Sequence, residues 1–97
     1  MFDLRGIKVV MAKLRKNEGP GKIEEIPTGR TEIRYTYYLK EKMAFTFGVT
    51  RSSKSKSKKF YYVPRQMGIV NSEYRKLYEC PWQKKDLNKK LIESGIV

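Results

Sequence analysis

Residues 51–59, RSSKSKSKK, are the part of the chain whose residue types and spacing point most directly to chemistry. The segment contains no acidic residue and supplies five positive charges: Arg51, Lys54, Lys56, Lys58 and Lys59. In an extended chain, the alternation of Ser and Lys places the three middle lysines on one side and hydroxyl groups on the other. Both groups bind phosphate oxygens without reading a base sequence. The pattern predicts a phosphate-binding segment, with a solvated loop as the alternative.

The composition of the whole chain also favours an anionic partner. Its 97 residues include 22 Lys and Arg against 10 Asp and Glu, and no His, which gives a net charge of +12. So much charge on a small domain repels itself, and a polyanion relieves that repulsion. Nucleic acid, an anionic membrane surface and an acidic protein all fit, and we expect nucleic acid. A cationic surface that serves only solubility is the alternative.

Enzymatic chemistry has few candidate residues in this sequence. The absence of His removes the commonest general base, and Cys80 has no partner base or second cysteine. Glu24, Glu25 and Glu32 could bind magnesium as in some nucleases, but ion pairs with neighbouring Lys and Arg explain them better. We therefore expect no cofactor, no metal and no catalytic residue, and a binding protein rather than an enzyme.

The N-terminal residues predict a helix. Leu4, Ile7, Met11 and Leu14 recur at spacings of three or four residues behind Asp3, a candidate N-cap. The sequence Gly-Pro-Gly at 19–21 ends this helix, because proline cannot continue it and glycine accepts a left-handed cap. A strand at 7–11 is the competing interpretation.

The middle of the chain predicts an antiparallel sheet of three to four strands. Residues 33–40 and 44–50 alternate apolar and polar side chains, and Phe60–Val63 is predicted as a further strand that Pro64 stops. Lys22–Ile26 is either a short strand or an extended arm. In this interpretation, the basic segment connects two neighbouring strands of the sheet.

Two helices are predicted after residue 68. The first begins at Asn71 or Ser72, and the second carries an apolar face of Leu87, Leu91 and Ile92, with Gly95 just past its end. The chain is therefore expected to form one α+β domain over residues 1–97. Its element order is α-β-β-β-α, with the helices packed on one face of the sheet.

The other face of the predicted sheet is expected to be polar and basic. It bears Arg34, Thr36, Tyr38, Lys40, Thr46 and Thr50. Cations and rings on an open sheet face can bind phosphates and stack bases, so Arg34 and Lys40 are the second set of candidate contacts. Tyr38 is the candidate for stacking, and an ordinary solvated sheet face is the alternative.

Two stretches of the C-terminal half resemble the HicA-type (YcfA-like) toxins, small RNA-binding proteins with a fold like that of double-stranded-RNA-binding domains. The tail KKDLNKKLIESGIV (84–97) looks like the final helix of that family. The stretch YYVPRQM (61–67) is similar to its strand-ending V-P-R segment. The resemblance covers residues 31–97 at most and implies an RNA-binding fold. The family's catalytic histidine has no counterpart in RTEIRY (30–35).

A second resemblance is to the paired strands of GIY-YIG endonucleases, which YTYYLKEKMAFTFGVTR (35–51) looks like. Those strands precede a helix with a catalytic arginine, whereas SSKSKSKK follows here. The predicted function is nucleic-acid binding, with RNA favoured over DNA. A histidine-free nuclease of either type, a structural protein of a ribonucleoprotein and a protein-interaction module are the alternatives.

The sequence also carries expectations about location. Residues 1–10 lack the pattern of a signal peptide, and no stretch is apolar enough to span a bilayer, so we expect a cytoplasmic protein without a membrane partner. Abundant Lys, Glu and Ile with few Gln and Asn are typical of thermophilic proteins. The oligomeric state stays open at this point.

Overall fold

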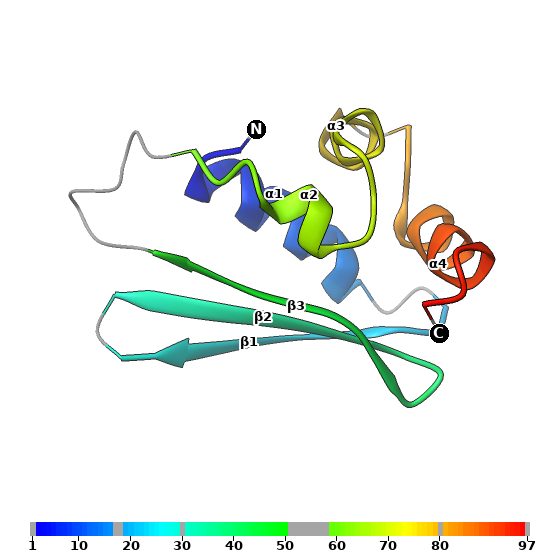
Figure 1. The fold of residues 1–97 in the computed structure, drawn as a ribbon, viewed down its shortest axis with the longest axis horizontal. Coiled ribbons are helices and arrows are strands. Elements are labelled where there is room, and N and C mark those ends of the chain that lie inside the picture. Colours follow the sequence, from blue (N-terminus) through cyan, green and yellow to red (C-terminus); the bar gives the residue numbers. More distant parts are fainter. Residues whose placement is uncertain (1, 17–18, 30, 51–58, 80, 97) are drawn as a thin grey trace.

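The structure, a computed structural model, describes residues 2–16, 19–29, 31–50, 59–79 and 81–96. Its helices are α1 (Leu4–Arg15), α2 (Val63–Gln66), α3 (Asn71–Glu79) and α4 (Lys84–Glu93). Its strands are β1 (Lys22–Thr28), β2 (Glu32–Leu39) and β3 (Lys42–Thr50), which form one antiparallel sheet in the order β1-β2-β3. The helices all lie on one side of this sheet (Figure 1), so the α+β architecture is confirmed.

Helix α1 begins where the sequence indicates. The Asp3 carboxylate accepts a hydrogen bond from the Gly6 backbone N–H at 2.8 Å, and this bond lowers the pKa of Asp3. Ile7, Met11 and Leu14 are fully buried on one stripe that faces the sheet and α3. The helical interpretation of these residues is therefore confirmed over the strand.

The sheet register separates an inner face from an outer face. Tyr37 lies opposite Ile23 on β1 and opposite Phe45 on β3. The inner side chains of β2 and β3 are buried under the helices: Ile33, Tyr35, Tyr37, Leu39, Phe45, Phe47 and Val49. Lys40 and Glu41 form the two-residue turn between these strands, and both have positive φ, 54° and 63°, as tight hairpin turns require.

The predicted strand at Phe60–Val63 is wrong. Phe60 and Val63 are buried while Tyr61 and Tyr62 are exposed, which is a spacing of three rather than the alternation of a strand. Val63 and Pro64 start the short helix α2, since proline fits the first turn of a helix. The third strand is instead β1, which extends to Thr28. The basic segment therefore connects β3 to α2 and not one strand to another.

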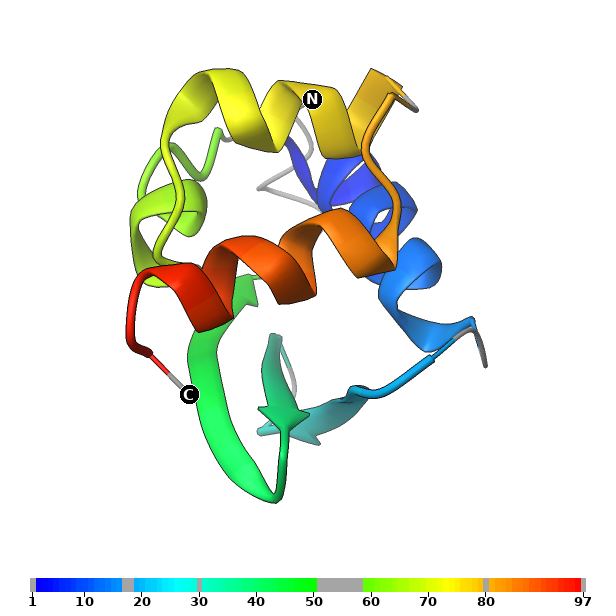
Figure 2. The same cartoon turned by 90° about the vertical axis from the view of Figure 1, so that its right-hand side faces the viewer.

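Helices α3 and α4 complete the layer above the sheet. Figure 2 shows the sheet below and the four helices above it, with α4 facing the viewer. Tyr74 and Leu77 of α3 are fully buried, as are Leu87 and Leu91 of α4. Ile92, predicted on the same apolar face, is 40% exposed. No helix among the described residues has the length and apolar character to cross a membrane.

Candidate nucleic-acid interface

The outer face of the sheet is open, because the helices lie on the inner side (Figure 1). The register places on it residues from all three strands, and its charged residues within the strands are Lys22, Glu24, Glu32 and Arg34. The two cations and the two carboxylates balance one another. The face is therefore polar and open, as the sequence predicts, but it is not basic, because alternating positions of β1 and β2 bring two glutamates to it.

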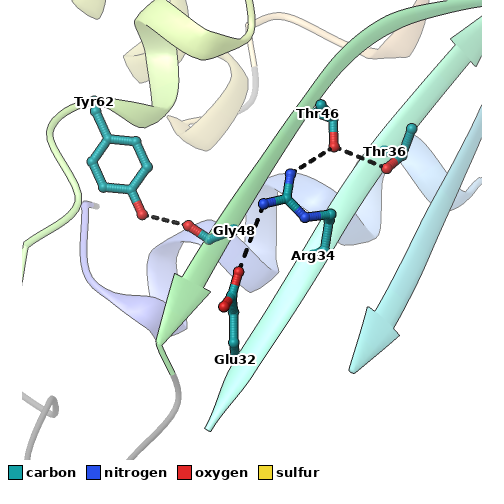
Figure 3. Close-up of polar contacts among 6 residues, drawn as sticks. All are labelled: Glu32, Arg34, Thr36, Thr46, Gly48 and Tyr62. Carbon is teal, nitrogen blue, oxygen red and sulfur yellow. Dashed lines mark hydrogen bonds and ion pairs between the residues drawn. The ribbon is translucent and has the colours of Figure 1, made fainter. Parts of the chain in front are cut away.

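Arg34 lies in a network of polar contacts on this face (Figure 3). Its guanidinium donates through Nη1 to Thr46 Oγ1 at 3.2 Å, and Nη2 lies 3.7 Å from Glu32 Oε1. The Thr46 hydroxyl in turn shares a hydrogen bond with the Thr36 hydroxyl at 3.1 Å. The Arg34 side chain is thus directed across β3 and already has a carboxylate neighbour, although both side chains are almost half exposed.

Gly48 makes the path of Arg34 and Glu32 possible. A Cβ atom on Gly48 would collide with Glu32 Oε1 and touch Arg34 Nη2, so a larger residue here would force the Glu32 side chain to move. On the opposite edge of β3, the Tyr62 hydroxyl donates to the Gly48 carbonyl (Figure 3). This bond joins β3 to the start of α2 and covers part of the strand edge, where unpaired backbone groups would otherwise be exposed.

Tyr38 and Lys40 lie toward the other end of the sheet. Tyr38 is 36% exposed on the outer face beside Met43, next to a register shift in the β2–β3 ladder. Lys40 is exposed in the hairpin turn. Six residues of strand separate Arg34 from Lys40, a distance of roughly 20 Å along β2. The structure therefore brings Tyr38 near Lys40, whereas Arg34 lies near the end of β3 that leads into the basic segment.

Four of the five candidates in the basic segment, namely Arg51, Lys54, Lys56 and Lys58, lie outside the described residues. The fifth, Lys59, is exposed, and its Nζ lies 3.9 Å from the Asp3 carboxylate at the start of α1. The next residue, Phe60, is buried and donates its backbone N–H to the Phe2 carbonyl at 2.8 Å. The segment therefore ends at a fixed point of the helix layer, beside the first turn of α1.

Two lysines of the helix layer are buried and serve the fold. Lys84 is 4% exposed, and its Nζ donates to the carbonyls of Lys16 at 3.0 Å and Gly21 at 2.6 Å. Lys13 donates to the Leu77 carbonyl near the end of α3. Ammonium groups at the ends of helices satisfy carbonyls that lack partners within the helix. These cations are consequently unavailable to a ligand.

Asn88 and Tyr37 extend the junction around Lys84. The Asn88 amide donates to the Pro20 carbonyl at 2.7 Å and accepts from the Tyr37 hydroxyl. Burial raises the pKa of Tyr37 to about 12, so this hydroxyl stays protonated and donates at neutral pH. The end of α1, the turn at 19–21 and the start of α4 are thereby fixed to one another and to the sheet.

Three exposed lysines surround this junction or lie on the approach to it. Lys8 is on the outer side of α1, Lys16 is its C-cap residue and Lys85 is in the first turn of α4. We call these three residues the lysine flank. None of their ammonium groups forms an ion pair within the described part of the chain. The net charge indicates exposed lysines, but only the fold shows that α1 and α4, from opposite ends of the sequence, bring Lys16 and Lys85 to one hollow.

The acidic residues that could bind a metal ion are dispersed in the described part of the chain. Among them no three His, Cys, Asp or Glu side chains lie close enough to hold a metal ion. Glu24 and Glu25 lie on opposite faces of β1, and Glu25 pairs with Arg15 and accepts from the Tyr35 hydroxyl at 3.1 Å. The ion-pair interpretation of Glu25 and of Glu32, which lies beside Arg34, therefore agrees with the geometry.

The comparisons with protein-family models, curated proteins and solved structures found no match to this chain. The resemblance to HicA-type toxins stays a prediction, and the function rests on the physical chemistry of the chain itself.

Proposed function

We propose that this domain binds nucleic acid through phosphate contacts, and that it prefers RNA to DNA. The observation that supports this most strongly is the segment at 51–59, with five cations and no acid in nine residues, on a domain of net charge +12. Phosphate contacts from Lys, Arg and Ser side chains position a protein on nucleic acid without reading its sequence. The segment supplies the first set of contacts: Arg51, Lys54, Lys56, Lys58 and Lys59.

The open sheet face supplies the second part of the proposed interface. Arg34 and Lys40 are phosphate contacts near opposite ends of β2, and Tyr38 between them is a stacking surface for a base. Single-stranded regions of RNA present unstacked bases that aromatic side chains bind in this way. An exposed tyrosine on an uncovered sheet therefore favours single-stranded RNA as the ligand over a closed duplex.

The test is a binding titration by fluorescence anisotropy. Single- and double-stranded RNA and DNA are titrated at several salt concentrations, with and without magnesium. We expect single-stranded RNA to bind most tightly, with an affinity that falls steeply as salt rises because counterions are released. An absence of binding to every nucleic acid at low salt would overturn the proposed function. Cleavage that chelator abolishes would support the nuclease alternative instead.

The contribution of the segment is tested by replacing Lys54, Lys56, Lys58 and Lys59 with Ser. If each lysine contacts one phosphate of a single strand, the slope of log affinity against log salt should become shallower by about 3. An unchanged slope, with binding retained, would show that the segment contacts no phosphate and that its charge is only solvated.

A further inference from the structure

We propose that the lysine flank, Lys8, Lys16 and Lys85, is a second phosphate-binding surface that holds the backbone of a nucleic-acid strand. This inference rests on the proposed function and extends it to a surface on the helices, away from the outer sheet face. The ligand class is a phosphodiester strand, bound through its phosphates and not its bases.

The ammonium groups of the lysine flank differ from those of the paired lysines in their neighbours. The lysines that serve the fold have identified partners: Lys84 and Lys13 donate to carbonyls, and Lys90 pairs with Glu73 at 3.5 Å. The lysine flank has no such partner among the described residues and is exposed. An exposed ammonium group without a carboxylate neighbour gains more from a phosphate than one that must first leave an ion pair.

The surface around Lys16 and Lys85 is concave. Lys16 and Lys85 line an open hollow of about 590 Å³ together with Gly19 and Gln83, and none of these described lining residues is acidic. Lys85 also borders an adjoining hollow of about 420 Å³, along α4, in which Lys89 and Glu93 take part. Lys85 borders both hollows, so concave surface lies on either side of it, at the end of α1 and along α4. A concave path with cations at its sides fits an extended chain better than a flat surface does.

The backbones that carry Lys16 and Lys85 are joined by a hydrogen bond. The carbonyl of Lys16 accepts from Lys84, which begins α4 directly before Lys85. Figure 2 shows the end of α1 and the start of α4 side by side at this junction. Because these partly buried hydrogen bonds fix the two backbones, Lys16 and Lys85 approach a ligand from backbone positions set before binding. Less entropy is then lost when the ligand binds than at a surface that must first become ordered.

The basic segment ends beside α1, the helix that carries Lys8 and precedes Lys16. Lys59 lies beside Asp3 at the start of α1, and Lys8 and Lys16 follow on the exposed side of the same helix. Eight residues of helix separate Lys8 from Lys16, a distance of about 12 Å. Ala12, a small exposed residue, lies between them on the same row of the helix, and the exposed residues Val9 and Arg15 flank this row. Lys59 therefore lies at one end of α1, and the hollow beside α4 lies at the other end.

The experiment compares two triple variants of the full chain. K8Q/K16Q/K85Q removes the lysine flank, and K42Q/R65Q/K76Q removes three exposed charges on β3, α2 and α3 as a control with the same net charge. Glutamine keeps helix propensity close to that of lysine, so thermal melts should show both variants folded. For single-stranded RNA, we expect the flank variant to make the salt slope shallower by about 2, and the control variant to change it by less than half as much.

A second measurement locates the contact in the unmodified protein. Lysine acetylation followed by mass spectrometry is compared with and without single-stranded RNA. We expect the RNA to protect Lys8, Lys16 and Lys85 more than Lys42. Equal slopes for the two variants, or equal protection at all four lysines while the unmodified protein still binds, would overturn this inference and leave the proposed function intact. Failure of the unmodified protein to bind any nucleic acid would overturn both.

Discussion

The sheet and the rest of the chain differ in how they carry charge. Residues 22–50, which contain the three strands, hold five basic and four acidic residues, whereas the remainder of the chain holds seventeen basic and six acidic ones. The sheet is nearly neutral although the protein has a net charge of +12. Almost all of the electrostatic attraction for an anion therefore originates outside the strands.

The reason for the difference is local geometry. In the sheet, a charged side chain has neighbours on its own strand and on the strands beside it, and Arg34 finds Glu32 and Thr46 there. On α1, the residues one turn away on the exposed stripe are Ala12 and further cations, so Lys8 and Lys16 find no carboxylate among the described residues. This difference predicts a division of roles. The helices and the basic segment should set most of the salt dependence of binding, and the sheet should contribute mainly through stacking by Tyr38, with a smaller ionic part from Arg34 and Lys40.

The largest expected effect is on stability, at the junction where Lys84 joins the end of α1, the turn at 19–21 and the start of α4. Replacing Lys84 by Met keeps the apolar stem but removes the donor that two backbone carbonyls share. We expect a loss of about 2 kcal/mol in the free energy of unfolding, because hydrogen bonds to charged groups carry about 1.5–3 kcal/mol. For a domain of this size the melting temperature should fall by roughly 10 °C.

Lys85→Met is the matched control for that experiment, since Lys85 is the next residue on α4 and is exposed. Its free energy of unfolding should stay within about 0.5 kcal/mol of the unmodified protein. Urea unfolding measures both variants. Equal stability of Lys84→Met and Lys85→Met would show that the buried ammonium group does not stabilise the junction.

The sequence predicted most of the fold because its periodic signals are strong. Alternation over residues 33–40 and 44–50 matched the buried inner face, and the spacing of Leu4, Ile7, Met11 and Leu14 matched α1. It failed at Phe60–Val63, where aromatic and β-branched residues suggested a strand. Burial of Phe60, Val63 and Met67 follows helical spacing, and Pro64 starts a helix as readily as it stops a strand.

The candidate site was less accessible to sequence reasoning. The sequence places Arg34 and Tyr38 correctly on the outer face. It does not place the two glutamates there, because Glu24 lies on β1, whose strand character was open, and Glu32 precedes the predicted strand at 33–40. Lys84 and Lys85 looked alike as neighbours in a charged helix, although one is buried and the other exposed. Only tertiary contacts from α1 and the turn at 19–21 distinguish them, and no local pattern encodes those contacts.

An intermediate effect is expected on the sheet side of the comparison. Tyr38→Leu removes the ring but keeps an apolar side chain, and Tyr38→Phe keeps the ring. Since stacking of one base contributes about 1–3 kcal/mol, Tyr38→Leu should weaken binding of single-stranded RNA by about tenfold. The salt slope should not change, because no ionic contact is lost, and Tyr38→Phe should bind almost normally. A shallower slope for Tyr38→Leu would contradict the division of roles between sheet and helices.

The smallest effect should come from making the sheet face basic. Glu32→Gln removes the carboxylate beside Arg34, and the ion pair is exposed enough that the free energy of unfolding should change by less than about 0.5 kcal/mol. Without this carboxylate neighbour, Arg34 should bind its phosphate more tightly, so affinity at low salt should rise about two- to fivefold, as expected for one exposed charge pair. Glu79→Gln, which removes the partner of Arg75 on α3, makes the same change of charge at a distance from this face. An equal rise in affinity for the two variants would show that Arg34 contacts no phosphate, and that the open face takes no part in phosphate binding.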